Sequence, residues 1–427
     1  MSRDTVVLIA SVLAALLFVF GTPIVLCMGL WVAIVCSLSD ILPLSNFGQS
    51  AMFGLKIFAL LAMPLFILTG DLIRAGGIAV RLTDFARAAF KFVPGQLAVA
   101  TTAACGAFAA ISGSNAATAA TMGRIMIPEM QRRGYEPVFA AATAASGGIV
   151  GVIIPPSLIF IVYGVLLGLS PGDLFIAGII PGILMVAAMS ITAAVISKRN
   201  GWDPPARPSL RETGAAAWRA NLGFLGIIIA LAGIFGGFFS PTEVAGVVVL
   251  YGLVAGLLFT RELKLRDVPA VFLESATING LIAPIVGLSI ILQETFTAIG
   301  VPALMQGFLE PMMHGYWPAV LTCMALILIA GTILESVPNV ILFAPILAPL
   351  AAKAGVDPIH FAMIFCVGDA IGFITPPYGL NLFVISGITN LPYMRIAMRA
   401  MPYLISVLIA WVLIAVFPQL SLVLLRK

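Results

Sequence analysis

The chain alternates long uncharged apolar runs with short segments that hold most of its charged residues. The runs 6–39, 220–240 and 400–425 contain no Asp, Glu, Lys or Arg. Each is long enough for a helix to cross a hydrocarbon core of about 30 Å. This pattern predicts an all-α polytopic membrane protein. We expect residues 1–427 to form one integral domain in the lipid bilayer, with the apolar N-terminus retained as a span.

The placement of the basic residues gives an expected orientation, because Lys and Arg gather in cytoplasmic loops. Segment 198–219 contains five of them and segment 261–267 contains three. Two apolar runs, 220–239 and 243–260, lie between these segments. We therefore expect residues 198–269 to form a cytoplasmic linker and two scaffold helices, which leave the cytoplasm and return to it.

The first expected repeat, residues 52–197, combines a re-entrant hairpin with a broken helix. Residues 95–130 are mostly apolar, with a polar interruption at 112–115 and basic residues on both flanks. Basic flanks on both sides favour a hairpin that enters the membrane and returns to the same face. Residues 136–169 then cross outward, and two prolines break this helix at 151–156.

The second expected repeat, residues 270–425, has the opposite topology. Its hairpin, 317–352, is expected to enter from the external face, because its flanks are poor in Lys and Arg. Its broken helix, 357–390, is interrupted at Thr375-Pro376-Pro377. The two halves together predict a transporter of inverted repeats.

The N-terminal run is interpreted as one long span, 6–39, bent near Thr22-Pro23. This interpretation places the N-terminus in the cytoplasm and the C-terminus in the periplasm. Two shorter spans would reverse the sidedness of everything downstream unless another crossing also changed.

A skeleton of glycines and prolines relates the two expected repeats at a fixed offset of 221 residues. Nine like-for-like matches share this offset: Pro128/Pro349, Gly134/Gly355, Pro137/Pro358, Gly147/Gly368, Gly151/Gly372, Pro155/Pro376, Pro156/Pro377, Pro171/Pro392 and Pro181/Pro402. The hairpin tips match at an offset of 224, through Pro94/Pro318, Ser112/Ser336 and Asn115/Asn339, so each tip reads Ser-x-x-Asn. Paired breaks in corresponding halves of an apolar chain indicate the central binding site of a transporter.

The breaks suit a hard monovalent cation. Unwound backbone inside a membrane needs partners for its N–H and C=O groups, and free carbonyls at the ends of half-helices coordinate sodium. The alternative is that the breaks are kinks alone and that small-residue tracts such as 116–121 only pack helices together. We favour cation binding because a break and a polar tip occur together in each half.

Composition narrows the function classes. Hydrophobic residues make up 61% of the chain and charged residues 9%, with a mean hydropathy of +1.14, whereas soluble domains carry about 25% charged residues. The net charge is +4, but the chain has no soluble domain with a basic face that could bind nucleic acid. The sequence lacks the phosphate-binding G-x-x-x-x-G-K-[ST] motif that would indicate ATP hydrolysis. It also lacks a Ser/His/Asp or H-E-x-x-H pattern that would indicate an enzyme. Five scattered cysteines without C-x-x-C spacing argue against a metal centre or disulfides.

Ionisable residues inside a membrane are candidates for function. Glu335 lies at the second hairpin tip, while Glu294 and Asp369 lie in otherwise apolar runs. Glu335 is the preferred candidate, since Asp369 fits a packed hydrogen-bond network equally well.

In these motifs the chain resembles the large membrane subunit of tripartite ATP-independent periplasmic (TRAP) transporters, the DctM-like family, over nearly its whole length. The motifs are Met63–Gly70 (MPLFILTG), Ile111–Ser114 (ISGS), Ile154–Ser157 (IPPS), Ser240–Glu243 (SPTE) and Thr375–Phe383 (TPPYGLNLF). The resemblance implies a sodium-coupled symporter that imports an organic acid, a carboxylate, across a bacterial or archaeal inner membrane. It further implies an elevator-type motion of the transport core. It also implies a separate small four-helix membrane subunit and a periplasmic substrate-binding protein.

Carried over to this sequence, the resemblance implies two sodium sites and a substrate site, with Na⁺ as the transported coupling ion. The first sodium site would use Ser112, Asn115, Gly151, Ile154 and Pro156, and the second Gly331, Gly372, Thr375 and Tyr378. The substrate would face Ser114, Thr118, Ser157 and Asn381, to which we add the tip residues Glu335 and Asn339. Many family members carry Asp where this chain has Thr118, and this departure leaves the transported acid open.

Two other functions compete with this interpretation. A stand-alone sodium/anion symporter of the same inverted-repeat design would transport without a binding protein. A non-transporting membrane scaffold would use Ser112 and Thr375 for stability alone.

Overall fold

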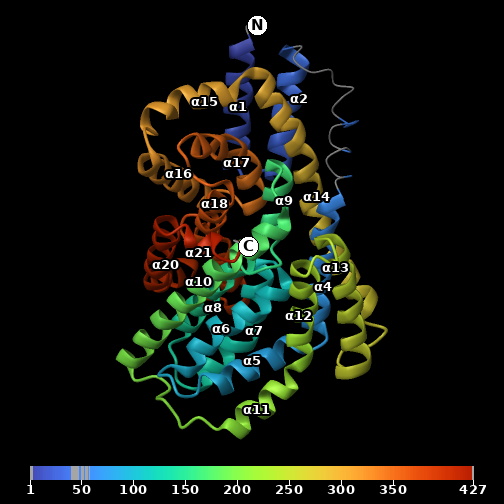
Figure 1. Cartoon of the computed structure of the whole chain (residues 1–427), viewed down its shortest axis with the longest axis vertical. Helices are drawn as coiled ribbons and strands as arrows, with labels where there is room; N and C mark the ends of the chain where they lie inside the picture. The colour runs from blue at the N-terminus through green and yellow to red at the C-terminus, as the bar shows by residue number, and fades with distance from the viewer. Residues whose placement is uncertain (1–2, 40–47, 50–51, 53–55, 57, 426–427) are drawn as a thin grey trace.

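The computed structural model describes residues 3–39, 48–49, 52, 56 and 58–425, and within these ranges all regular elements are helices (Figure 1). In the described part of the chain, six helical segments are long and apolar enough to cross a membrane: η1 (Phe58–Leu61) with α4 (Ala62–Ala75), α10 (Pro171–Asn200), α13 (Pro241–Val254) with η3 (Ala255–Thr260), α14 (Val268–Ile299), α17 (Ser336–Lys353) and α20 (Tyr393–Val416). The short helix α11 (Leu210–Arg219) and α12 (Asn221–Phe235) meet at 61° and pass the same test as a pair. The predicted all-α polytopic membrane class is confirmed.

Two helices joined by a tight turn form the first hairpin, α6 (Gln96–Ser112) and α7 (Asn115–Arg132). Gly113 in the turn has φ +60°, a left-handed conformation that glycine adopts without a steric penalty. The Ser114 side chain caps α7, because its hydroxyl accepts a hydrogen bond from the Ala117 N–H at 3.4 Å. Residues 96–132 therefore form a helical hairpin, and its re-entrant course through the membrane stays a prediction.

The open end of this hairpin is held by Asp203, in the linker that follows α10. The buried carboxylate accepts hydrogen bonds from Gln96 Nε2 at 3.0 Å, the Leu97 N–H at 3.3 Å and the Tyr135 hydroxyl at 3.4 Å. It also forms an ion pair with Arg133 at 3.5 Å. Gln96 and Leu97 begin α6, whereas Arg133 and Tyr135 follow α7. One side chain thus joins both ends of the hairpin.

The predicted break in the next helix is also present. α8 (Pro137–Gly148) continues as the short helix η2 (Ile149–Val152), and the helix resumes only at α9 (Leu158–Leu167). Pro155 and Pro156 lie in the gap, where they lack the N–H that a continuous helix would use. The long helix α10 then returns to the linker.

The second half repeats this order of elements. A hairpin of α16 (Tyr316–Gly331) and α17 is followed by α18 (Pro358–Gly372), a break at 373–379, α19 (Leu380–Thr389) and α20. The two Pro-Pro bonds at the breaks, Pro155-Pro156 and Pro376-Pro377, are both cis.

The two hairpins open toward opposite ends of α20. Near the start of α20, Arg399 pairs with Glu136 at 2.6 Å, next to the end of the first hairpin. Beyond the end of α20, Ser421 on α21 (Gln419–Leu422) hydrogen-bonds His360 at 3.2 Å, next to the end of the second hairpin. The inverted topology of the two halves and the boundaries 52–197 and 270–425 stay predictions.

The N-terminal run is not one long span. α1 (Arg3–Val19) and α2 (Ile24–Ser39) fold back on each other, and Trp31 Nε1 donates a hydrogen bond to Ser11 Oγ at 3.0 Å between them. Gly21, with φ +87°, lies in the turn between the two helices. The position of the interruption was predicted, but the bent-span interpretation is wrong because the chain reverses there. The sidedness of the N-terminus stays a prediction.

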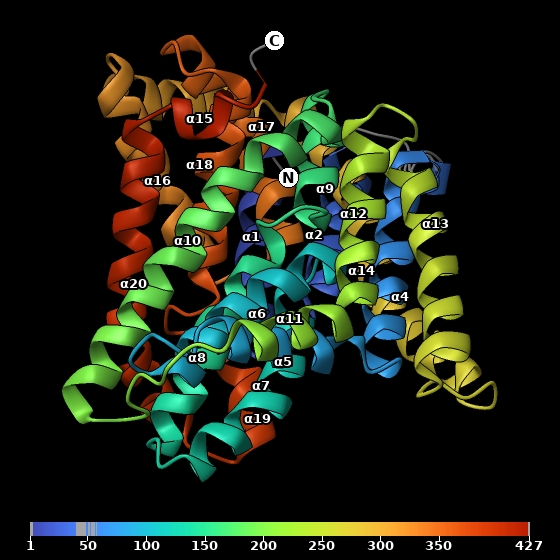
Figure 2. The same cartoon turned by 60° about the horizontal axis from the view of Figure 1, so that its bottom comes forward.

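Apolar side chains divide the molecule into a large core and two smaller clusters along α14. The large core gathers both hairpins and both broken helices. One small cluster joins α1 and α2 to α14 through residues such as Trp31, Val32 and Ile291, and the other joins α4 to the start of α14. Figure 2 shows α10 and α20 running along the large core, on the far side from α4 and α13.

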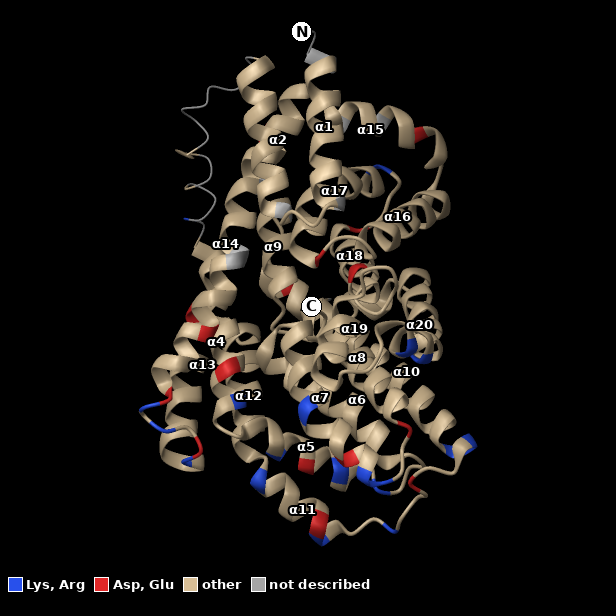
Figure 3. Ribbon diagram, turned by 180° about the vertical axis from the view of Figure 1, so that it is seen from behind, with Lys and Arg blue, Asp and Glu red and all other residues tan. Residues whose placement is uncertain are grey.

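Lys and Arg residues concentrate toward one end of the molecule (Figure 3). This end includes the amphipathic helix α5 (Ile78–Ala89), α11 and the turn after η3. Arg81 pairs with Glu262 at 3.0 Å and Lys91 with Glu212 at 2.7 Å, which ties these elements together. The opposite end carries α15 (Val301–Leu309) and η4 (Glu310–Met312).

Candidate transport site

Each hairpin tip lies directly against the break of its own half. In the first half a Cβ atom on Gly151 would overlap the carbonyl group of Ser114, and a Cβ on Gly113 would lie 2.8 Å from the carbonyl oxygen of Pro156. In the second half a Cβ on Gly372 would overlap the carbonyl group of Gly331. Glycine is therefore required where backbone meets backbone, and the carbonyl groups of the tips and breaks converge.

The first predicted sodium ligands come together around this contact. Ser112 Oγ lies 3.0 Å from Thr118 Oγ1, and the Thr118 hydroxyl donates to the Ser114 carbonyl at 2.7 Å. Among the described residues, no N–H or O–H group donates to the carbonyls of Ile154 and Pro156. Oxygen atoms without donors at a proline-broken helix are the kind of ligand that sodium accepts.

The second predicted set is arranged in a similar way. Thr375 Oγ1 donates to the Ile371 carbonyl at 2.8 Å, which leaves the lone pairs of the hydroxyl oxygen available. The Tyr378 N–H reaches the tip by donating to the Thr332 carbonyl at 3.2 Å. The Tyr378 carbonyl itself accepts from the Tyr393 hydroxyl at 3.4 Å, so it already has a donor.

The fully buried carboxylate of Asp369 holds the polar residues of the second tip. The sequence alone did not decide the role of this residue. Asp369 accepts a hydrogen bond of 2.5 Å from Ser336 Oγ and one of 2.7 Å from Asn339 Nδ2. The buried Asn339 Oδ1 has no hydrogen-bond partner among the described residues. The network that we considered for Asp369 is therefore present, and both polar residues of the Ser-x-x-Asn tip take part in it.

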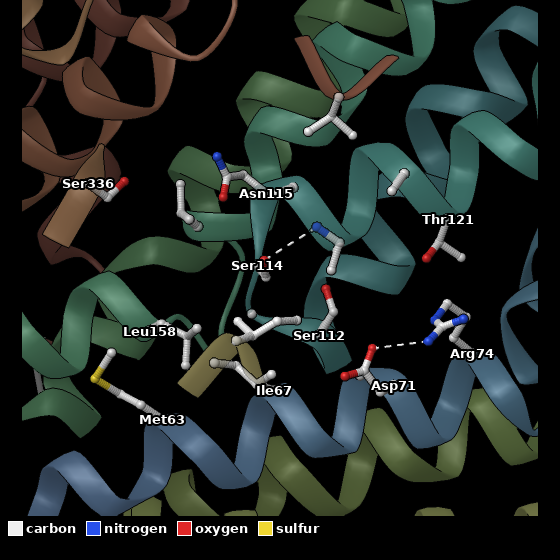
Figure 4. Close-up of a pocket in the computed structure, with 18 of the residues that line it drawn as sticks. Met63, Ile67, Asp71, Arg74, Ser112, Ser114, Asn115, Thr121, Leu158 and Ser336 are labelled. Carbon is white, nitrogen blue, oxygen red and sulfur yellow. Dashed lines mark hydrogen bonds and ion pairs between the residues drawn. The ribbon is translucent and has the colours of Figure 1, made fainter. Parts of the chain in front are cut away.

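A cavity of about 360 Å³ opens beside the first tip, between the hairpins and α4 (Figure 4). Four of the predicted site residues line it, namely Ser112, Ser114, Asn115 and Glu335. Its lining also includes ionisable side chains that were not among the predicted site residues: Asp71, Arg74, Arg124 and Glu274. Figure 4 shows Ser336 at one side of the cavity and Thr121, Asp71 and Arg74 at the other.

The other predicted substrate residues lie outside the lining of this cavity. Thr118, Ser157, Asn339 and Asn381 are all buried. Ser157 Oγ donates to the Val152 carbonyl at 2.5 Å, and Asn381 Nδ2 donates to the Ala145 carbonyl at 3.1 Å. These bonds give Ser157 and Asn381 structural roles in this conformation, and their contact with substrate stays a prediction.

The described residues contain no group of three or more His, Cys, Asp or Glu side chains arranged to hold a metal ion. A cation at the tips would therefore depend on carbonyl, hydroxyl and amide oxygens. These are ligands for an alkali cation, whereas nitrogen and sulfur ligands suit transition metals.

Comparison with known proteins identifies the family. The family model described as "Tripartite ATP-independent periplasmic transporter, DctM component" matches residues 11–420. The chain belongs to this family. It is thus a multi-pass large permease subunit of a TRAP transporter, a transport protein and not an enzyme.

The chain is similar in sequence to known relatives and in fold to a solved structure. It is 36% identical over 367 residues to the C4-dicarboxylate TRAP transporter large permease protein DctM of Pseudomonas aeruginosa, covering 86% of each chain. It is 32% identical over 380 residues to the sialic acid TRAP transporter large permease protein SiaM of Vibrio cholerae, covering 89% of each. The Alcanivorax borkumensis YdaH transporter is similar in fold, with a TM-score of 0.54, 15% identity and 87% coverage of both chains.

Proposed function

We propose that this subunit imports an organic acid by coupling its movement to the entry of sodium ions. The observation that carries the proposal is the pairing of each polar hairpin tip with a proline-broken helix beside one cavity. Two such pairs offer two clusters of uncharged oxygen ligands, and half-helix ends of this kind bind coupling ions in secondary transporters.

The proposed substrate is a carboxylate. The two relatives above are named for C4-dicarboxylate and for sialic acid, which are both organic acids. The cavity has a volume of about 360 Å³, within the range of small-molecule sites, and its lining includes Arg124 without an ion-pair partner among the described residues. A cationic group in a water-filled cavity of a membrane protein favours an anionic substrate.

The two partners are part of the proposal, because the family is described as tripartite. A periplasmic binding protein would deliver the acid, and a small four-helix membrane subunit would pack on the scaffold. The helices α12, α13 and η3 expose large apolar side chains, including Leu225, Ile228, Leu250 and Leu258, that suit lipid or such a subunit. The core of hairpins and broken helices would move past this scaffold as one elevator.

Uptake into proteoliposomes tests the proposal. Vesicles that contain this chain and its membrane partner are loaded with potassium, and uptake of labelled acids is measured with and without an inward sodium gradient and the binding protein. Uptake that needs both supports a TRAP symporter of the inner membrane. Sodium-driven uptake without the binding protein would establish the stand-alone symporter instead. If no acid is taken up with all three proteins present, the non-transporting scaffold is the remaining interpretation.

A further inference from the structure

The cavity contains two ionisable side chains that differ from the rest of its lining. Arg74 pairs with Asp71 at 3.4 Å and with Glu274 at 2.6 Å, and Asp71 also accepts a hydrogen bond from Ser275 at 2.6 Å. The charges of Arg74, Asp71 and Glu274 therefore partly neutralise one another, and each of these side chains already has a partner within the protein. Arg124 and Glu335 form no ion pair with any described residue, although both line the cavity.

The two unpaired charges lie on different sides of the cavity. Arg124 is on the same face of α7 as Ala117, Ala120 and Thr121, since these residues follow the i, i+3, i+4, i+7 spacing of one helical face, and all four line the cavity. Thr121 lies at the side of Asp71 and Arg74 in Figure 4. Glu335 comes from the second hairpin, next to Ser336, which Figure 4 shows on the opposite side.

The side chains between these two charges leave room for a ligand. Ala116, Ala117 and Ala120 present only methyl groups along α7, while Met63, Ile67 and Leu158 form an apolar wall. A ligand that spans the cavity therefore meets a guanidinium at one side and a carboxylate at the other.

We propose that Arg124 anchors the carboxylate of the substrate and that Glu335 selects what the other end of the substrate carries. An Arg guanidinium binds a carboxylate through two parallel hydrogen bonds. The Glu335 carboxylate accepts hydrogen bonds from hydroxyl or ammonium groups but repels a second carboxylate. The transported acid then carries one carboxylate and a hydroxyl- or ammonium-bearing body, and dicarboxylates are excluded. This inference rests on the proposed import of an organic acid.

A set of six-carbon acids tests the selection directly. Gluconate has one carboxylate and five hydroxyls, glucarate adds a second carboxylate at the far end of a similar body, and hexanoate lacks the hydroxyls. Binding to the purified full chain in lipid nanodiscs with sodium is measured as an increase in melting temperature over a range of ligand concentrations. We expect gluconate to bind at least about tenfold more tightly than glucarate and than hexanoate.

Three variants assign the two roles. Arg124→Gln is expected to weaken gluconate binding about tenfold or more, the loss of one charge-assisted pair, and Arg124→Lys is expected to bind with intermediate affinity. Glu335→Gln is expected to reduce the ratio of the gluconate affinity to the glucarate affinity by at least about threefold, because the negative charge that repels the second carboxylate is gone. Arg132→Gln is the matched control, since Arg132 lies on the same helix and its side chain is 79% exposed outside the cavity.

Each result separates this inference from the proposed function. Equal binding of glucarate and gluconate to the wild type, or wild-type gluconate binding by a stably folded Arg124→Gln protein, would overturn the inference. Sodium raises the melting temperature of the wild type in the absence of any acid if the proposed coupling is correct. Sodium stabilisation together with a preference for dicarboxylates would therefore reject the inference alone, whereas no response to sodium or to any acid would reject both.

Discussion

Gly372 at the end of α18 lies so close to Gly331 at the end of α16 that a Cβ atom on Gly372 would overlap the Gly331 carbonyl group. A similar close approach occurs in the first half, where a Cβ on Gly151 would overlap the Ser114 carbonyl group. Gly151 and Gly372 are separated by the 221 residues that relate the two halves. Each half therefore joins its hairpin tip to its broken helix through a glycine.

Gly372→Ala is expected to push the second tip away from the break. Overpacking of this kind costs about 1–3 kcal/mol, and displacement of the Gly331 carbonyl should also abolish stabilisation of the protein by sodium. The measurement is the melting temperature of the purified chain with sodium and with potassium. Gly387→Ala is the control, because nothing lies within 4 Å of a Cβ at Gly387. Equal sodium responses in the two variants would contradict the expectation.

Asp203→Ala is expected to loosen the open end of the first hairpin. The substitution leaves the Gln96 amide and the Leu97 N–H without their buried acceptor, and hydrogen bonds to a charged group contribute about 1.5–3 kcal/mol each. The variant should melt at a clearly lower temperature than the wild type. Asp84→Ala removes an exposed ion pair with Arg87 instead and should cost less than about 1 kcal/mol. Similar melting temperatures for the two variants would show that the Asp203 contacts are not stabilising.

Residue 208 and the C-terminus are expected on opposite sides of the membrane. The linker lies near the start of α20, where Arg399 stacks 5.9 Å from the Trp202 ring, whereas α21 follows the end of α20. A membrane-impermeant thiol reagent applied to intact cells should label Lys427→Cys and not Pro208→Cys. Background is low because all five native cysteines are buried. Labelling of Pro208→Cys alone would reverse the proposed orientation.

Much of this fold could be predicted from the sequence, because glycine and proline act on the backbone locally. The turn at Gly113 falls inside the predicted interruption at 112–115, and the gaps at 153–157 and 373–379 overlap the predicted breaks at 151–156 and 375–377. A proline removes its own N–H and a glycine permits positive φ wherever the rest of the chain lies. Hairpins and broken helices were therefore readable from residue type and spacing.

Features that depend on packing between distant parts of the chain could not be predicted from the sequence. The run 6–39 is equally apolar throughout, and whether Gly21 kinks a helix or reverses it depends on what α2 packs against, which is α14. Arg124 was not among the predicted site residues, because its place in the cavity lining depends on the rotation of α7 in the folded protein. Asp203 looked like one charge in a polar linker, and only the fold brings it to both ends of the first hairpin.

Thr375→Val and Ser112→Ala are expected to weaken sodium binding in one half each. Each substitution removes a hydroxyl oxygen at a tip or break while leaving the side chain close to its original size. The loss of one polar partner corresponds to about 1–3 kcal/mol, or roughly tenfold or more in affinity. Since the ions and the acid would share one mobile core, acid uptake should fall in parallel, and higher sodium should partly restore it. Uptake is measured against sodium concentration at matched membrane expression. Thr297→Val is the control, because its hydroxyl makes the same type of helical bond, to Gln293 at 2.9 Å, on an exposed surface. If both site variants keep the sodium dependence of Thr297→Val, the paired tips and breaks serve packing and not ion coupling.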